Sequence, residues 1–259
     1  MKRQYKDMPW LMGAEGGDDP LLRLFCFPYG GSGASIYRHW QEDVSDGIEV
    51  CPVQLPGREN RINDPLATDM EGLLDSLLAC VEDGSDIPFA FFGHSMGGII
   101  AFELARHLGE RHLVEPVHLF ISGTPIPRMF EEHARTGRCY HRLPDDQFLK
   151  LVLGTSKGIP DQVLLSEEMM RLILPILRAD LALMESLPLA SGRAPLPIPM
   201  TVFGGAHDEL VAPTAVAAWE NYTTASFTKI MFPGGHYFLH TDHDMLLRHI
   251  NETALLYLI

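Results

Sequence analysis

Ser95 stands in a short motif that suits acyl transfer by a serine nucleophile. It is the central residue of GHSMG (93–97), a G-x-S-x-G pattern. A hydrophobic run over 89–92 leads into the motif, and a helix-forming run over 99–108 leaves it. A nucleophile elbow requires this strand–turn–helix setting, because the strained turn exposes the serine and leaves no room for side chains two residues away on either side. We therefore predict Ser95 as a nucleophile, in preference to a serine that only caps a helix.

A serine hydroxyl needs a base, and His236 is the best candidate. It lies in FPGGHYF (232–238), directly after the last expected strand, where two glycines allow a sharp turn. The competing histidines are His240, His243 and His249, which fall in or near the final expected helix and are expected to face solvent. The sequence therefore predicts that His236 takes the proton from Ser95.

The base in turn needs an acid that fixes its tautomer. With an elbow of this type the chain order is serine, acid, histidine, and Asp208 in FGGAHDELV (203–211) follows a strand at the right place. Glu209 is the neighbouring rival, and Asp180 is a weaker one. We predict Asp208 as the acid, the alternative being a turn residue that caps the next helix.

Acyl transfer also needs backbone N–H groups that stabilise a tetrahedral oxyanion. The residue after the nucleophile, Met96, is expected to supply one of them. The second is expected from Tyr29 or Gly30 in FPYGGSG (27–33), the loop after the first strand, unless this is a glycine-rich turn without a role. A phosphate-binding loop is disfavoured, because no Lys followed by Ser or Thr comes after these glycines.

The elements that must position these residues alternate between apolar runs and helical patterns. This rhythm predicts a single α/β domain, residues 1–259, with a mostly parallel sheet flanked by helices. Expected strands cover 21–27, 48–54, 88–92, 116–122, 200–203 and 226–232; expected helices cover 34–44, 68–81, 95–108, 148–153, 169–177, 180–187 and 245–258. The rhythm breaks over approximately 124–199, where helices replace strands. We interpret this insertion as a lid over the strand ends, the alternative being plain scaffold.

Composition narrows the function classes. The formal net charge is -14, which disfavours nucleic acid and anionic membranes as partners. No apolar run approaches the roughly 20 residues of a membrane span, and the polar N-terminal stretch does not resemble a signal peptide. The four cysteines form no CxxC pair, and no metal-ligand spacing such as HExxH occurs. We expect a cytoplasmic enzyme without a metal site.

Several longer segments resemble type II thioesterases, the free-standing editing enzymes of non-ribosomal peptide and polyketide assembly lines. The resemblance runs from about residue 22 to 259. It is carried by FCFPYGGSGASIYRHW (25–40), VQLPGRE (53–59), FGHSMGG (92–98), AFELAR (101–106), LPDDQFL (143–149), LRAD (177–180) and FPGGHYF (232–238). Family members often carry Ala where this chain has Gly30. The resemblance implies an α/β-hydrolase fold with a helical lid and a triad of Ser95, Asp208 and His236.

The resemblance also implies the substrate and the partner. The substrate would be an acyl thioester on the phosphopantetheine arm of an acyl or peptidyl carrier domain, and the enzyme would need no cofactor of its own. The chain has no room for a carrier domain, so the carrier is expected to arrive in trans. Arg135, Arg138 and Arg142 lie in the lid segment, whose charge is balanced, and could receive an acidic carrier, unless they only form a solvated mixed-charge surface.

Two other functions stay open on the residues alone. An oxygen esterase or an acyltransferase could use the same fold and triad. A non-catalytic binding module is the other alternative, although all three triad positions carry competent side chains.

Overall fold

The computed structural model describes residues 9–12, 19–130, 139–155, 166–187 and 192–258. Six parallel strands in these ranges form one sheet in the order β2-β1-β3-β4-β5-β6. The strands are β1 Leu22–Phe27, β2 Ile48–Pro52, β3 Phe89–His94, β4 His118–Ser122, β5 Met200–Gly205 and β6 Phe227–Phe232. This parallel sheet, with helices on both faces, has the architecture of the α/β-hydrolase class that the sequence predicts.

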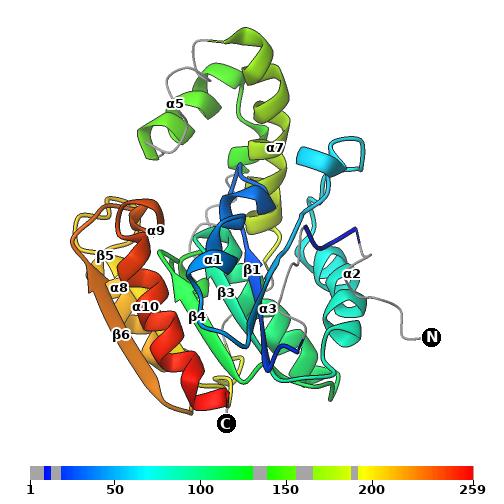
Figure 1. Cartoon of the computed structure of the whole chain (residues 1–259). Helices are drawn as coiled ribbons and strands as arrows, with labels where there is room; N and C mark the ends of the chain where they lie inside the picture. Colours follow the sequence, from blue (N-terminus) through cyan, green and yellow to red (C-terminus); the bar gives the residue numbers. More distant parts are fainter. Residues whose placement is uncertain (1–8, 13–18, 131–138, 156–165, 188–191, 259) are drawn as a thin grey trace.

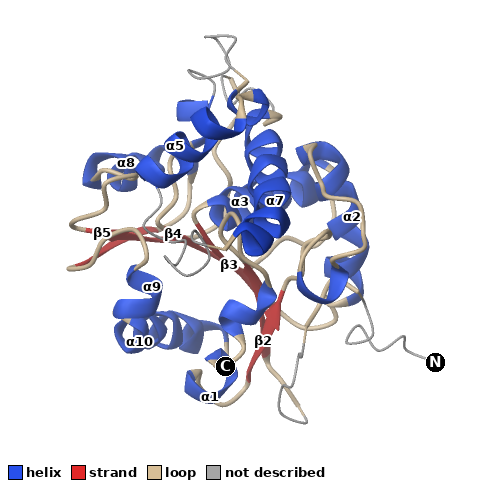
Figure 2. Ribbon diagram, turned by 90° about the horizontal axis from the view of Figure 1, so that it is seen from above, coloured by secondary structure: helices blue, strands red, loops and turns tan. Residues whose placement is uncertain are grey.

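Helices cover both faces of the sheet (Figure 2). On one face lie α2 Met70–Asp83, α3 Met96–Glu110 and α8 Pro213–Ala218; on the other lie α1 Trp40–Asp43, α9 Phe238–Thr241 and α10 His243–Ala254. Because strand side chains alternate between the two faces, β1 sends Phe25 and Phe27 into the first layer and Leu24 and Cys26 into the second. The sheet is therefore buried between two apolar layers, as parallel sheets usually are.

The segment that follows β1 differs from the sequence prediction. A helix was expected over 34–44, but the chain forms a 3-10 turn, η2 Ala34–Tyr37, and then the four-residue α1. Polar groups outside the segment bind its residues: the backbone N–H of Ala34 donates to Oε1 of Gln54, and the Tyr37 hydroxyl donates to the Phe27 carbonyl. The segment is thus fitted to the loops around it and not to a helical repeat.

The insertion stands above the carboxyl ends of the strands (Figure 1). It contains η4 Tyr140–Arg142, α5 Asp145–Thr155 and α7 Glu167–Glu185. The two helices expected over 169–177 and 180–187 are one continuous helix that passes through Pro175. Burial of its second half, including Leu183 and Met184, stabilises the helix despite the hydrogen bond that proline removes. Only the first half of α7 stands clear of the core, with Met169 and Leu172 exposed.

The remaining short elements are η3 Glu59–Arg61, η5 Trp219–Tyr222 and η6 Leu255–Tyr257. Among the described residues, no helix combines the length and the apolar character that crossing a bilayer requires. Cys26 and Cys51 are free thiols buried in the strands β1 and β2.

The topology marks one place for a ligand. The chain runs from β1 to β2 on one side and then crosses to β3 on the other side of β1. Open α/β sheets bind ligands at the carboxyl ends of the strands beside such a switch point. The loops after β1 and β3, which carry Tyr29, Gly30 and Ser95, meet there.

Candidate active site

Ser95 occupies the sharp turn between β3 and α3. Its backbone has φ 54° and ψ −117°, a strained conformation for a residue other than glycine. The neighbouring strand β4 holds the turn, because the Ser95 N–H donates to the carbonyl of Ser122 at 2.8 Å. Ser95 is partly exposed, whereas its neighbours His94 and Met96 are buried. The strand–turn–helix order thus presents one hydroxyl at the end of the sheet.

The glycines two residues before and two residues after Ser95 lie where the backbone leaves no room for a side chain. A Cβ atom on Gly93 would lie 2.1 Å from the carbonyl oxygen of Gly97, and one on Gly97 would lie 2.1 Å from the carbonyl oxygen of Phe27. Real Cβ atoms do not approach backbone so closely. The absence of side chains lets the start of α3 rest directly on β3 and on the loop after β1.

Asp208 and His236 form a hydrogen-bonded pair. Nδ1 of His236 lies 2.8 Å from Oδ2 of Asp208, and the Asp208 side chain is fully buried. The other carboxylate oxygen, Oδ1, accepts the backbone N–H groups of Leu210 at 2.8 Å and of Val211 at 3.0 Å. These two donors fix the carboxylate, which leaves Oδ2 to orient the imidazole.

The rival acids are placed differently. Glu209 is exposed, and Asp180 forms a buried ion pair with Arg58 at 2.6 Å. In the described part of the chain, Asp208 is thus the one of the three candidates that bonds to His236.

The rival histidines each face another side chain. His243 faces Asp43 at 3.0 Å, and His249 faces Glu252 at 3.5 Å. His240 is exposed as expected, yet its Nε2 also lies 3.1 Å from the hydroxyl of Tyr29.

His94 is a buried histidine that the sequence reasoning missed. Its Nδ1 lies 2.9 Å from the hydroxyl oxygen of Ser122, and its ring centroid lies 5.1 Å from that of His236. Burial, together with the nearby His236 and His240, holds the pKa of His94 well below its usual range. His94 is therefore neutral at pH 7 and adds no positive charge beside His236. Nothing in the sequence marks this, because the motif leaves its second position free.

The expected oxyanion donors lie at the ends of β1 and β3. Met96 is the first residue of α3, so its N–H has no acceptor within the helix. Neither Tyr29 nor Gly30 donates its backbone N–H to another residue in the described ranges. The Tyr29 ring packs edge-on against His94 and Tyr237, and burial raises the pKa of its hydroxyl to about 12. All three N–H groups are thus available to a ligand at the switch point.

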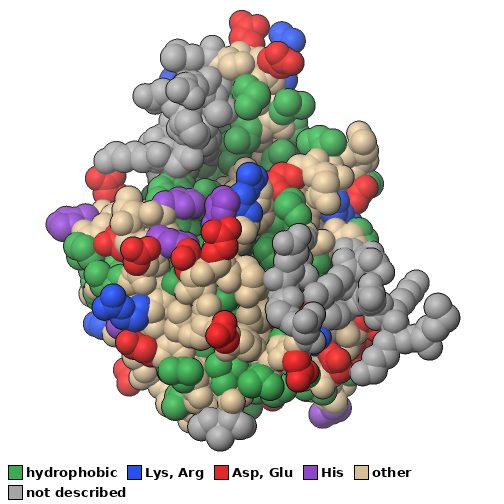
Figure 3. Space-filling model, viewed as in Figure 1, with side chains coloured by type: hydrophobic (Ala, Val, Ile, Leu, Met, Phe, Trp, Pro, Cys, Tyr) green, Lys and Arg blue, Asp and Glu red, His purple; other side chains and the backbone are tan. Residues whose placement is uncertain are grey.

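The expected docking residues are only partly visible. Arg142 is exposed at the end of η4, where its Nε lies 3.2 Å from Nε2 of His141. Arg135 and Arg138 lie outside the described residues. Figure 3 shows acidic side chains spread over one face of the molecule and histidines gathered below the insertion. No group of three or more His, Cys, Asp or Glu side chains in the described ranges could hold a metal ion.

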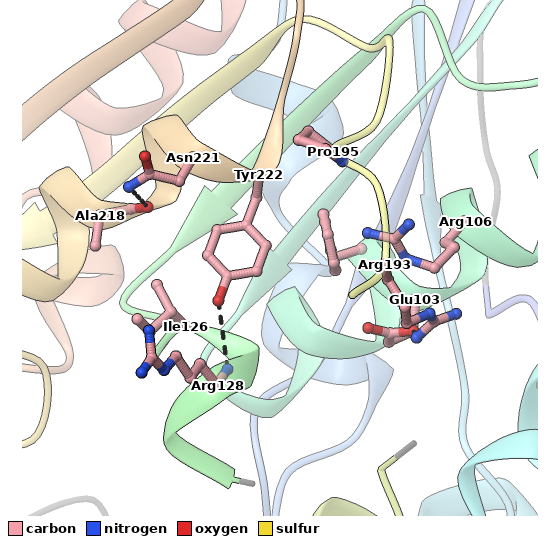
Figure 4. Close-up of a pocket in the computed structure, with 10 residues that line it drawn as sticks. Glu103, Arg106, Ile126, Arg128, Arg193, Pro195, Ala218, Asn221 and Tyr222 are labelled. Atoms are coloured by element: carbon pink, nitrogen blue, oxygen red, sulfur yellow. Dashed lines mark hydrogen bonds and ion pairs between the residues drawn. The ribbon is translucent and has the colours of Figure 1, made fainter. Parts of the chain in front are cut away.

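A cavity of about 360 Å³ lies away from this site, between α3, the loop after β4 and η5 (Figure 4). Ion pairs lie at its edge: Arg193 bridges Glu103 at 2.6 Å and Glu110 at 3.2 Å. Arg106 donates to the carbonyl of Ala194 and lies over the ring of Phe102. These contacts attach the segment before β5 to α3. We therefore interpret the cavity as part of the packing between these elements and not as a ligand site.

Comparison with known proteins identifies the family. The profile of the thioesterase domain matches residues 22–254. The chain belongs to the thioesterase family. This thioesterase is thus a hydrolase of thioesters, and the resemblance noted in its motifs is confirmed.

Relatives match this thioesterase over nearly their whole length. It is 40% identical to the gramicidin S biosynthesis protein GrsT of Aneurinibacillus migulanus, over 92% of this chain and 91% of that protein. It is 38% identical to a Brevibacillus parabrevis protein named linear gramicidin dehydrogenase LgrE, over 96% and 94%. The structure of RedJ, a thioesterase of the prodiginine pathway in Streptomyces coelicolor, superposes with a TM-score of 0.82 at 36% identity, over 96% and 92%.

Proposed function

We propose that this thioesterase hydrolyses acyl groups from the phosphopantetheine arm of carrier domains and so clears stalled or incorrect acyl groups from an assembly line. The observation that supports this most strongly is its similarity, over 91% or more of each chain, to proteins of peptide and prodiginine biosynthesis. As the family resemblance implies, we expect an acyl or peptidyl carrier to be the partner. The cytoplasm, where assembly lines have their substrates, is the compartment we propose.

The proposed chemistry uses Ser95, His236 and Asp208. Ser95 Oγ attacks the thioester carbonyl while Nε2 of His236 accepts its proton. The N–H of Met96 and that of Tyr29 or Gly30 stabilise the resulting oxyanion. The C–S bond then breaks, and the imidazolium returns the proton to the departing sulfur.

A second half-reaction releases the product. His236 takes a proton from water, the hydroxide oxygen bonds to the acyl carbon, and the ester bond to Ser95 breaks. Serine regains the proton and a free acid leaves. Each step uses only groups of this chain and water, so the proposal includes no cofactor.

The relative LgrE is named a dehydrogenase, so a reaction that uses a dinucleotide cofactor is a second candidate function. A dinucleotide-binding loop after β1 would carry the pattern G-x-G-x-x-G. The glycines Gly31 and Gly33 begin such a pattern, but Ile36 stands where the third glycine is needed. We therefore favour hydrolysis.

Two measurements test the proposed function. Purified enzyme is incubated with a panel of acyl-loaded carrier proteins, and intact mass shows whether the carrier returns to its free-thiol form. Rates on matched acyl-pantetheine thioesters and oxygen esters are then compared. We expect free thiol to appear and the thioester to react faster. Faster cleavage of the oxygen ester, or transfer of the acyl group to another acceptor, would favour an esterase or an acyltransferase.

A further inference from the structure

The loop that carries Tyr29 and Gly30 is held by a carboxylate from the insertion. Oδ2 of Asp180, in the buried half of α7, accepts the backbone N–H of Gly31 at 2.7 Å. Gly31 has φ +81°, and a Cβ atom there would lie 2.8 Å from Cδ2 of Leu177, one turn earlier on α7. The helix thus touches this loop through a hydrogen bond and through direct packing.

Arg58 holds that carboxylate in place. Its Nη2 donates to Oδ1 of Asp180 at 2.6 Å and its Nη1 donates to Oδ2 at 3.0 Å, so the pair is bidentate. Nη1 also donates to the carbonyl of Ser32 at 3.1 Å. The side chains of Arg58 and Asp180 are 4% and 5% exposed. Arg58 is therefore committed to the pair and to the loop, and it has no open face for substrate.

The contact bears directly on the oxyanion donors. A peptide group is planar, so fixing the N–H of Gly31 also fixes the carbonyl of Gly30 and limits the rotation of its backbone. Oδ2 of Asp180 would lie only 3.8 Å from a Cβ atom on Gly30. The N–H groups of Tyr29 and Gly30 precede this anchor by one or two residues. Their direction therefore depends on where α7 places its carboxylate.

We propose that Asp180 and Arg58 are positioning residues that set the direction of the oxyanion donors in the loop after β1. The inference rests on the proposed function, since it gives that loop an oxyanion role. It accounts for PGR (56–58) and LRAD (177–180), motifs to which the hydrolysis itself assigns no task. It also connects the position of α7 to the oxyanion donors, because a movement of the helix would move the Asp180 carboxylate that holds their loop.

Asp180→Asn tests the pair with a side chain of the same size. Asp180 meets donors on both oxygens, from Gly31 and Arg58 on one and from Arg58 on the other. An amide offers only one oxygen, so its NH₂ group must face a donor. We expect the loop to shift and kcat per active site, counted by fluorophosphonate labelling, to fall roughly 10- to 100-fold, less than or close to the loss of one whole donor. KM for an acyl-pantetheine thioester should change less than about threefold.

A second readout separates positioning from folding. A trifluoromethyl ketone analogue of the acyl group forms a tetrahedral adduct whose oxyanion uses the same donors. Its affinity should weaken by the same factor as kcat/KM. If Asp180→Asn fails to fold, the double variant Arg58→Met/Asp180→Leu replaces both charges with apolar groups, a change that buried ion pairs tolerate. It still removes the acceptor of Gly31.

The matched control is the buried pair Arg23–Glu49, which joins the amino-terminal ends of β1 and β2 at 2.9 Å, at the edge of the sheet opposite the loop after β1. Arg23→Met/Glu49→Leu should keep kcat per active site and the ketone affinity. Unchanged values in the folded Arg58 and Asp180 variants would overturn the inference. Ser95→Ala distinguishes this outcome from failure of the proposed function: an inactive Ser95→Ala beside fully active Asp180 variants refutes only the positioning role.

Discussion

Asp208 touches His236 with one carboxylate oxygen and two backbone N–H groups with the other. The distance from Oδ2 to Nδ1 of His236 is 2.8 Å, and Oδ1 receives the N–H groups of Leu210 and Val211. The carboxylate therefore cannot rotate without losing three hydrogen bonds. This arrangement fixes which imidazole nitrogen faces the acid, and it leaves Nε2 for Ser95 in the proposed mechanism.

Asp208→Asn should lower kcat by about 10⁴-fold. The amide oxygen would stay with the two backbone donors, which turns the NH₂ group toward Nδ1 of His236. The ring would then carry its proton on Nε2, where it cannot accept one from Ser95. Steady-state rates on an acyl-pantetheine thioester measure the loss. Glu209→Gln is the matched control and should stay within about twofold of the wild type; if it proves the more harmful change, the acid has been assigned one residue too early.

Gly97→Ala should damage both stability and turnover. The new Cβ would lie 2.1 Å from the carbonyl oxygen of Phe27, so β1 and α3 must separate. We expect the free energy of unfolding to fall by about 1–3 kcal/mol or more, and kcat to fall with it because the loop after β1 moves away from Ser95. Denaturant titration and initial rates test this.

Gly72→Ala in α2 controls for the chemical change. The nearest atom to its Cβ would be Oδ2 of Asp69 at 3.2 Å, a side-chain atom and not backbone, and alanine favours helix. We expect stability to be kept or raised and activity unchanged. Equal damage by the two substitutions would contradict the close-approach argument.

His118 should make stability fall as the pH is lowered. It is buried, with Nε2 at 2.9 Å from the Thr201 hydroxyl and Nδ1 at 3.1 Å from that of Tyr257, and burial lowers its pKa to about 4. Below an unfolded pKa of about 6.5 the unfolded chain binds a proton that the folded chain refuses. Stability contributed by the neutral ring is therefore present above pH 6.5 and lost toward pH 4.

Lowering the pH from above 6.5 to below 4 should remove about 3 kcal/mol of the folding stability that the neutral His118 ring contributes. In denaturant titrations between pH 7 and pH 4, His118→Gln should lose less stability than the wild type by about this amount. His94, which is also buried, contributes in the same direction to both proteins and cancels in the comparison. Parallel curves for the two proteins would contradict the assignment of His118.

Arg135, Arg138 and Arg142 remain our predicted contact for the carrier. Reversing all three to Glu should raise KM for acyl-carrier substrates several-fold and leave an acyl-pantetheine thioester unaffected. The effect should weaken with salt, because exposed charges are screened over about 8–10 Å. Arg248→Glu, an exposed position on α10, is the control for charge reversal. Equal losses on both substrates would show that the arginines support the fold or the site instead.

Local patterns were enough to predict the sheet, the elbow and the Asp208–His236 pair. The glycines of GHSMG and the strands before Asp208 and His236 are short-range signals, and parallel strands bring their carboxyl ends together. Contacts between distant segments carry no such signal. Asp180 could only be weighed as an alternative acid, because its partner Arg58 lies 122 residues earlier in the chain. The buried state of His94 and the continuity of α7 through Pro175 likewise depend on what packs around them.

The most direct test of the central claim compares the wild type with Ser95→Ala on one acyl-loaded carrier protein. Intact mass follows both the carrier and the enzyme over time, and circular dichroism verifies that the variant is folded. The account predicts that the wild type returns the carrier to its free-thiol mass, that fluorophosphonate labels it at Ser95, and that Ser95→Ala does neither at a measurable rate. Release of the acyl group by folded Ser95→Ala at close to the wild-type rate would contradict it.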